Sequence, residues 1–122
     1  MLGVKIMQDG FDIQNQLANF EYPRLFLKIL QLNLIDFEYW YLMDKTQVCT
    51  RRKGLLARYP DRNLIPFARR DDCDNIACFE VGRGEKVFII HDFSSPGFEQ
   101  EEEFQDFKDW FLHAISELLE NK

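Results

Sequence analysis

Cysteine is scarce in this 122-residue sequence, which contains three: Cys49, Cys73 and Cys78. An odd number of cysteines cannot pair completely within one chain, and no secretory signal is recognisable before them. We therefore expect reduced thiols and a cytoplasmic location. Because a chain of this length buries about two-thirds of the surface that its unfolded form exposes, we expect it to fold without disulfides or metals.

Long hydrophobic runs are also missing. None approaches the roughly 20 residues that a membrane-spanning helix needs, so we expect no membrane segment. The sequence contains no internal repeats or low-complexity linkers, and its length fits one domain over 1–122, which excludes a multidomain enzyme. Within that domain, residues 1–10 are expected to be either flexible or a short strand.

Positive charge is outweighed by negative charge. Lys and Arg number 15 against 21 Asp and Glu, so the net charge is −6, and the sequence pI is about 4.9. Such a chain repels a phosphate backbone unless its basic residues are segregated. We therefore expect no nucleic-acid partner and favour a basic protein partner, such as a nuclease. The basic residues at 51–53, 58, 62, 69 and 70 are expected to be solvated or paired with acids.

Aromatic side chains are abundant, at 15% of residues with twelve Phe. The hydrophobic pattern predicts helices over 11–20, 22–32 and 44–58, a strand over 37–42, and strands over 64–68, 75–81 and 86–91. Gly82-Arg83-Gly84-Glu85 is typical of a hairpin turn. We expect a single α+β domain, with a central antiparallel or mixed sheet of about 4–6 strands flanked by N-terminal helices and a long C-terminal helix.

The C-terminal helix has the clearest pattern, because apolar residues recur at intervals of three and four from Phe104 to Leu118. Glu99 and the glutamates at 101–103 are placed by this pattern at or just before its first turn. There they would complement the helix dipole, or form an acidic surface that steers a basic partner through Glu101 and Glu102.

Four aromatic residues between positions 37 and 41 cannot all enter one small core, because alternate residues of a strand face opposite ways. We expect Phe37 and Trp40 in the core. Tyr39 and Tyr41 are therefore candidates for contact with a partner.

A charged loop follows the 64–68 strand. It is either a partner-binding rim or a solvated turn, and both readings stay open. Its spacing of Asp72 and Asp74 lacks the glycine and distant glutamate of a calcium loop. His91 and Asp92 end a strand before a turn-rich segment, and we include them among the binding candidates, although a capped strand-end histidine is the simpler interpretation. The loop candidates are Arg69, Arg70, Asp71, Asp72, Asp74 and Asn75.

Zinc binding and thiol catalysis are weakly supported by Cys73, Cys78 and His91. These residues lack a reliable fourth ligand, and Cys78 lies in an apolar strand where a free cysteine is a common core residue. We expect no catalytic, cofactor-binding or metal-binding residues.

Several short strings occur in an order that resembles the SUKH superfamily, named after a yeast regulator of cell-wall synthesis. They are Glu21-Tyr22-Pro23, a segment around Trp40, the strings at 64–68, 74–79 and 87–92, and Phe104-Gln105-Asp106-Phe107. The resemblance covers about residues 20 to 118. It departs from the family pattern where many relatives carry a glycine-rich turn, because this chain has Arg69-Arg70-Asp71-Asp72-Cys73-Asp74.

The resemblance implies a compact α+β fold that acts by binding another protein and has no catalytic residues. Bacterial members are largely immunity proteins, so we expect a chain that neutralises a cognate toxin by covering its active or target-binding surface. The alternative is a cytoplasmic regulatory adaptor of the same fold that binds a host protein. A small hydrolase or metal-dependent enzyme is a third and weaker hypothesis.

Overall fold

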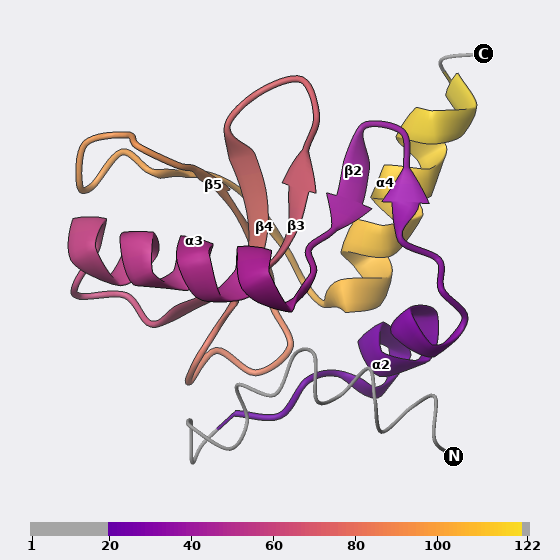
Figure 1. Cartoon of the computed structure of the whole chain (residues 1–122), viewed down its shortest axis with the longest axis horizontal. Helices are drawn as coiled ribbons and strands as arrows, with labels where there is room; N and C mark the ends of the chain where they lie inside the picture. The colour runs from indigo at the N-terminus through magenta and orange to yellow at the C-terminus, as the bar shows by residue number, and fades with distance from the viewer. Residues whose placement is uncertain (1–19, 121–122) are drawn as a thin grey trace.

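The computed structural model describes residues 20–120 (Figure 1). The chain folds as α2 (Arg24–Gln31), β1 (Asp36–Phe37), β2 (Trp40–Leu42), α3 (Lys45–Arg58), β3 (Leu64–Arg70), β4 (Asn75–Glu80), β5 (Val87–His91), β6 (Gln100–Phe104) and α4 (Phe107–Glu120). Between residues 20 and 120, no helix is both long enough and apolar enough to cross a bilayer. The predicted helix over 11–20 lies almost entirely outside the described residues.

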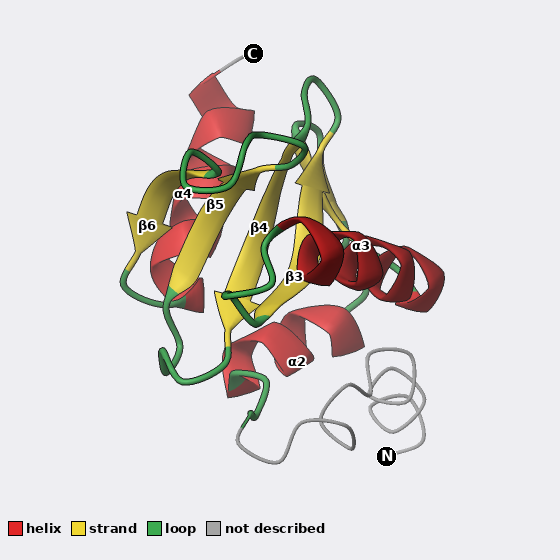
Figure 2. Ribbon diagram, turned by 90° about the vertical axis from the view of Figure 1, so that its left-hand side faces the viewer, coloured by secondary structure: helices red, strands yellow, loops and turns green. Residues whose placement is uncertain are grey.

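The six strands form one sheet in sequence order, and every neighbouring pair is antiparallel. This meander confirms the predicted α+β class and the predicted sheet. Figure 2 shows α3 on one face of the sheet and α2 with α4 on the other. The two edges are the two-residue β1 and the acidic β6, so any partner that approaches the sheet from the side meets one of these strands.

The helices begin where local chemistry favours it. Asp44 caps α3, because its carboxylate accepts the backbone N–H of Gln47 while the Gln47 side chain accepts the backbone N–H of Asp44, each at 2.9 Å. Pro23 precedes α2, where its missing N–H costs nothing. Val48 and Leu55 are the buried residues of α3, so this helix packs on the sheet through a narrow apolar stripe.

The core on the α2 and α4 face is built from aromatic rings. Phe67 of β3 stacks on Phe79 of β4 with ring centroids 4.4 Å apart, and Trp110 of α4 meets Phe67 edge-on at 5.0 Å. Phe26 of α2 contacts Phe67, Phe79 and Phe107. Edge-to-face and stacked pairs of this kind fix the angle at which α2 and α4 cross the sheet.

The prediction was wrong at the C-terminal helix, which begins at Phe107 and not at Phe104. Residues 100–104 form β6, which pairs with β5 through Ile89 opposite Glu102. The glutamates at 101–103 therefore lie on an edge strand, Glu99 lies in the loop before it, and none of them stands in the first turn of α4. Because four of the five residues of β6 are polar and exposed, hydrophobic periodicity could not reveal the strand.

Two further boundaries differ from the predictions. The single strand expected over 37–42 is a hairpin of β1 and β2, which turns at Glu38 and Tyr39. Strand β3 continues through Arg69 and Arg70, so the charged loop begins only at Asp71. Both differences arise from pairing with β2, since Trp40 lies opposite Arg70 and extends the ladder.

Candidate functional site

The predicted binding residues lie in three separate environments: an open groove at the β1–β2 hairpin, a pair of polar networks across the sheet, and a buried ion-pair cluster under α3. The groove has a volume of about 620 Å³. We call it the hairpin groove. Its lining residues come from the segment before β1, the hairpin and the β3–β4 loop: Ile35, Asp36, Glu38, Tyr39, Tyr41, Leu42, Asp71 and Asp72.

Backbone hydrogen bonds fix the walls of the hairpin groove. The N–H of Asp71 donates to the carbonyl of Tyr39 at 2.8 Å, which joins the hairpin turn to the β3–β4 loop. The N–H of Leu42 donates to the carbonyl of Ile35, also at 2.8 Å. The groove is therefore formed before any partner arrives, and a ligand would not have to order it.

The two tyrosines predicted as contact residues both line the groove, and each ring also lies against an arginine of β3. The guanidinium of Arg69 lies 5.2 Å from the Tyr41 ring centroid, and that of Arg70 lies 5.3 Å from the Tyr39 ring centroid. These cation–π contacts hold the rings in place. Tyr39 and Tyr41 remain partly exposed, so their surfaces are open to a partner.

Glu38 has an unusual backbone conformation for a glutamate. Its φ of 70° lies in the left-handed region, and it occupies the first position of the two-residue turn between β1 and β2. Glycine is the favoured residue there, because side chains of L-residues crowd the backbone at positive φ. The N–H of Glu38 donates to Asp36 Oδ1 at 3.0 Å, which compensates in part for the strain.

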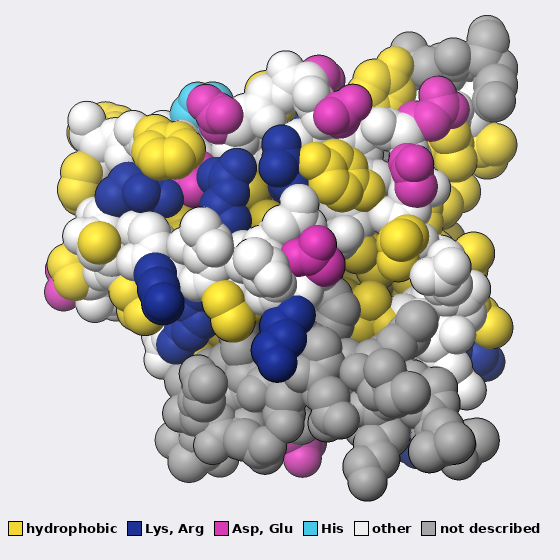
Figure 3. Space-filling view, viewed as in Figure 1, with side chains coloured by type: hydrophobic (Ala, Val, Ile, Leu, Met, Phe, Trp, Pro, Cys, Tyr) yellow, Lys and Arg dark blue, Asp and Glu magenta, His cyan; other side chains and the backbone are white. Residues whose placement is uncertain are grey.

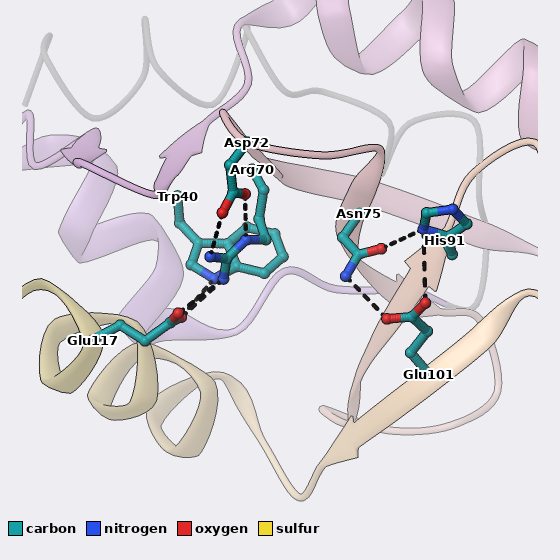
Figure 4. A network of polar contacts seen from close by, with 7 residues as sticks. All are labelled: Trp40, Arg70, Asp72, Asn75, His91, Glu101 and Glu117. Atoms are coloured by element: carbon teal, nitrogen blue, oxygen red, sulfur yellow. Dashed lines mark hydrogen bonds and ion pairs between the residues drawn. The ribbon is translucent and has the colours of Figure 1, made fainter.

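Arg70 is the centre of one polar network (Figure 4). Its guanidinium binds both carboxylate oxygens of Asp72, at 2.8 and 3.0 Å, and reaches Glu117 of α4 at 3.0 Å. The Trp40 indole N–H donates to the same Glu117 at 3.3 Å. The hydrogen bonds that Arg70 donates to Asp72 lower the pKa of Asp72 and raise the pKa of Arg70. Asp72 therefore anchors the loop to α4 through Arg70 and is not a free carboxylate.

A second network lies on neighbouring strands, as Figure 4 also shows. His91 Nδ1 lies 2.7 Å from Asn75 Oδ1, and Asn75 Nδ2 donates to Glu101 at 3.1 Å. Because the amide oxygen can only accept, Nδ1 is the donor in this bond. The prediction that His91 is a capped strand-end histidine is confirmed by this contact.

A smaller hollow of about 120 Å³ lies between the two networks and α4. Glu102 lines it together with Asn75, Arg70 and Glu117. Glu101 and Glu102 are both exposed, as is Asp74 in the β3–β4 loop. These three residues remain accessible to a partner.

Asp92 does not belong to an exposed binding surface, which corrects its inclusion among the candidates. Its side chain is fully buried and pairs with Arg51 at 2.7 Å and Arg58 at 2.6 Å, both from α3. Arg58 also lies 4.1 Å beneath the ring of Phe93. Asp92 thus ties the β5–β6 loop to α3, and its partners are 41 and 34 residues away in sequence.

Sequence reasoning missed half of the groove. Asp36, Glu38, Ile35 and Leu42 all line it, but none was a candidate. The signal that links Asp36 to the tyrosines is the hairpin register, in which Asp36 lies opposite Tyr41. This register becomes visible only when residues 36–42 are read as a hairpin.

The three cysteines differ in their exposure. Cys78 is fully buried, and burial raises the pKa of its thiol well above the usual value. Cys49 and Cys73 are exposed. Among residues 20–120, no group of three or more His, Cys, Asp and Glu side chains could hold a metal ion.

No protein-family model, curated protein or solved structure matches this chain. Its function must therefore be inferred from the geometry described above and from the order of its sequence motifs.

Proposed function

We propose that this chain is a non-enzymatic protein-binding domain of the cytoplasm, which acts as an immunity protein and neutralises a toxin by covering its active or target-binding surface. The observation that carries the proposal is the hairpin groove, where two half-buried tyrosines meet four carboxylates in a preformed hollow. Tyrosine is enriched at the energetic centres of protein interfaces, because it offers a large rigid surface with one polar atom.

The surroundings of the groove also suit a protein partner. Leu34 and Ile35, in the segment that leads into β1, expose 45% and 43% of their surface. Exposed aliphatic residues beside an aromatic groove provide the apolar centre that a stable interface needs, while the carboxylates form its polar rim. The sequence resemblance to the SUKH superfamily supports the same class of function.

Inhibition would be steric and electrostatic. A standard interface buries about 800 Å² on each partner, which exceeds the groove alone and would include the exposed β3–β4 loop and the edge of β1. A net charge of −6 would accelerate association with a basic toxin domain and would make the association rate fall with salt.

The first experiment is affinity capture of the tagged chain from its native cells in mild salt, followed by a growth-rescue test with the captured protein. A stoichiometric partner with a toxic domain, whose toxicity this chain suppresses, supports the proposal. A housekeeping partner without toxicity would overturn the immunity function and favour the regulatory adaptor.

The interface can be mapped with charge reversal at Asp71→Lys and Asp74→Lys together. Both side chains are exposed, so the fold should tolerate the change, whereas Asp72 is left intact because it holds Arg70. The matched control is Asp61→Lys with Glu85→Lys, which changes the net charge equally in two exposed turns away from the groove. If both pairs bind the captured partner with the same affinity as the parent chain, the β3–β4 loop is not part of the interface.

A further inference from the structure

The hairpin groove is lined by acidic side chains and by no basic ones. Its eight lining residues include four carboxylates and no cationic side chain. Arg69 and Arg70 lie next to the tyrosine rings, and Glu117 binds Arg70. Counting these neighbours, five carboxylates stand against two guanidiniums, so the region carries a net negative charge. Figure 3 shows acidic and hydrophobic side chains gathered over the β1–β2 part of this face, with basic side chains over α3.

Two of the four carboxylates are available for a ligand. Asp72 is bound by Arg70, and one oxygen of Asp36 accepts the N–H of Glu38. Within residues 20–120, the carboxylates of Glu38 and Asp71 have no hydrogen-bond or ion-pair partner, although both line the groove. They lie on the two walls that the Asp71 to Tyr39 backbone bond joins.

We propose that the hairpin groove binds an arginine side chain of the partner protein. This inference rests on the proposed function and specifies the partner group that the groove recognises. A guanidinium is planar, so it can stack on a tyrosine ring while it donates paired hydrogen bonds to a carboxylate. A lysine ammonium is not planar, so it can neither stack flat on the ring nor present a fork of donors to both carboxylate oxygens. Ile35 and Leu42 provide apolar surface for the three methylene groups of the arginine stem.

The groove has room for more than the arginine side chain itself. A hollow of about 620 Å³ is larger than one side chain needs, so it accommodates an arginine together with the peptide segment on either side of it.

The test uses two synthetic seven-residue peptides with blocked ends, Gly-Ser-Gly-Arg-Gly-Ser-Gly and the same peptide with citrulline in place of arginine. Citrulline keeps the shape of arginine but has no charge. Each is titrated into the ¹⁵N-labelled full chain, and amide chemical shifts are followed by NMR. We expect the arginine peptide to shift the amides of residues 36–42 and 71–72, and the citrulline peptide to bind at least fivefold more weakly.

The variant Glu38→Gln with Asp71→Asn removes both available carboxylates while leaving Asp36 and Asp72 in place. We expect it to weaken binding of the arginine peptide about tenfold, which corresponds to roughly 1.4 kcal/mol. The control variant Asp61→Asn with Glu85→Gln has the same net charge and should bind as the parent chain does. Thermal unfolding of both variants verifies that they are folded.

Three results would overturn the inference: equal binding of the two peptides, shifts confined to other segments such as β6, or equal weakening by both variants, which would indicate attraction to net charge only. The proposed function is tested separately by capture and growth rescue. If the groove variant protects cells from the captured toxin as well as the parent chain does, the inference fails while the immunity function stands. If the arginine peptide binds the groove but capture finds no toxin, the immunity function fails while the arginine site stands.

Discussion

Replacing Asp92 with asparagine should destabilise the protein strongly, although the substitution changes only one atom. The buried carboxylate accepts charged hydrogen bonds from Arg51 and from Arg58, at distances of 2.6 to 2.9 Å. Breaking a buried ion pair by removing one partner costs about 3–5 kcal/mol, because the remaining charge stays desolvated. The arginine side chains keep 22% and 28% of their surface exposed, so water relieves part of this penalty. We expect a loss of about 2–4 kcal/mol in the free energy of unfolding.

For a domain of this size, 1 kcal/mol corresponds to about 4 °C in Tm, so Asp92→Asn should lower Tm by roughly 8–16 °C. Calorimetry or circular dichroism measures the change, with Asp61→Asn as a control that removes one exposed carboxylate. A double-mutant cycle with Arg58→Gln then isolates the coupling between the two side chains. A Tm within 2 °C of the parent chain, or a coupling energy below about 0.5 kcal/mol, would refute a structural role for this cluster.

Three further predictions follow from the same structure. Ellman's reagent should modify Cys49 and Cys73 in the native protein, and Cys78 only after unfolding, because Cys78 is buried. Rapid reaction of all three thiols in the folded chain would contradict this prediction. Burial alone would raise the pKa of Glu99, but hydrogen bonds from the backbone N–H of Gly97 and from Arg62 outweigh it and lower the pKa. The stability that the Glu99 carboxylate contributes is therefore complete above the pKa of the unfolded chain and is lost as the pH falls through the pKa of the folded chain. Glu99→Gln should lower the free energy of unfolding by about 1–2 kcal/mol at pH 7 and leave it unchanged in strong acid, as measured by urea unfolding at several pH values. A loss that does not depend on pH would exclude this charge effect. Glu38→Gly should stabilise the chain by about 0.5–1 kcal/mol, because glycine adopts the positive φ without steric strain. The change would be seen as a higher urea midpoint at unchanged slope. An unchanged or lower midpoint would show that the glutamate is not strained.

The elements that sequence reasoning located correctly are those whose pattern is local. Asp44 marks the start of α3, and the apolar stripe of α4 repeats at helical spacing, although the stripe did not give the first residue of that helix. Strand β6 carries no such signal, because its glutamates are exposed and its position depends on pairing with β5. An edge strand rich in charge resists association with other edges, and that protection conceals the strand from hydrophobic periodicity.

The candidate site shows the same division. Four of the residues that line the groove, Tyr39, Tyr41, Asp71 and Asp72, were candidates from the sequence, because aromatic residues and charges are concentrated there. Asp92 was assigned to the surface because its neighbours are turn residues, whereas its burial depends on two arginines from a distant helix. No local pattern distinguishes a loop aspartate that contacts a partner from one that holds its own loop.

The hairpin that carries the groove consists of the two shortest strands of the sheet, so the groove depends on other contacts to keep its shape. Strand β1 has two residues and β2 has three, and a short hairpin of this kind is marginally stable alone. Its anchors are side chains that point to the opposite face: Phe37 packs against Phe111, and Trp40 packs against Trp110. Because residues alternate along β2, Tyr41 is directed toward the groove by the same backbone that buries Trp40 in the core. The aromatic core is thus what makes the groove rigid enough to recognise a side chain, and loss of the Trp40 contacts should weaken arginine binding without any change in the groove's own residues.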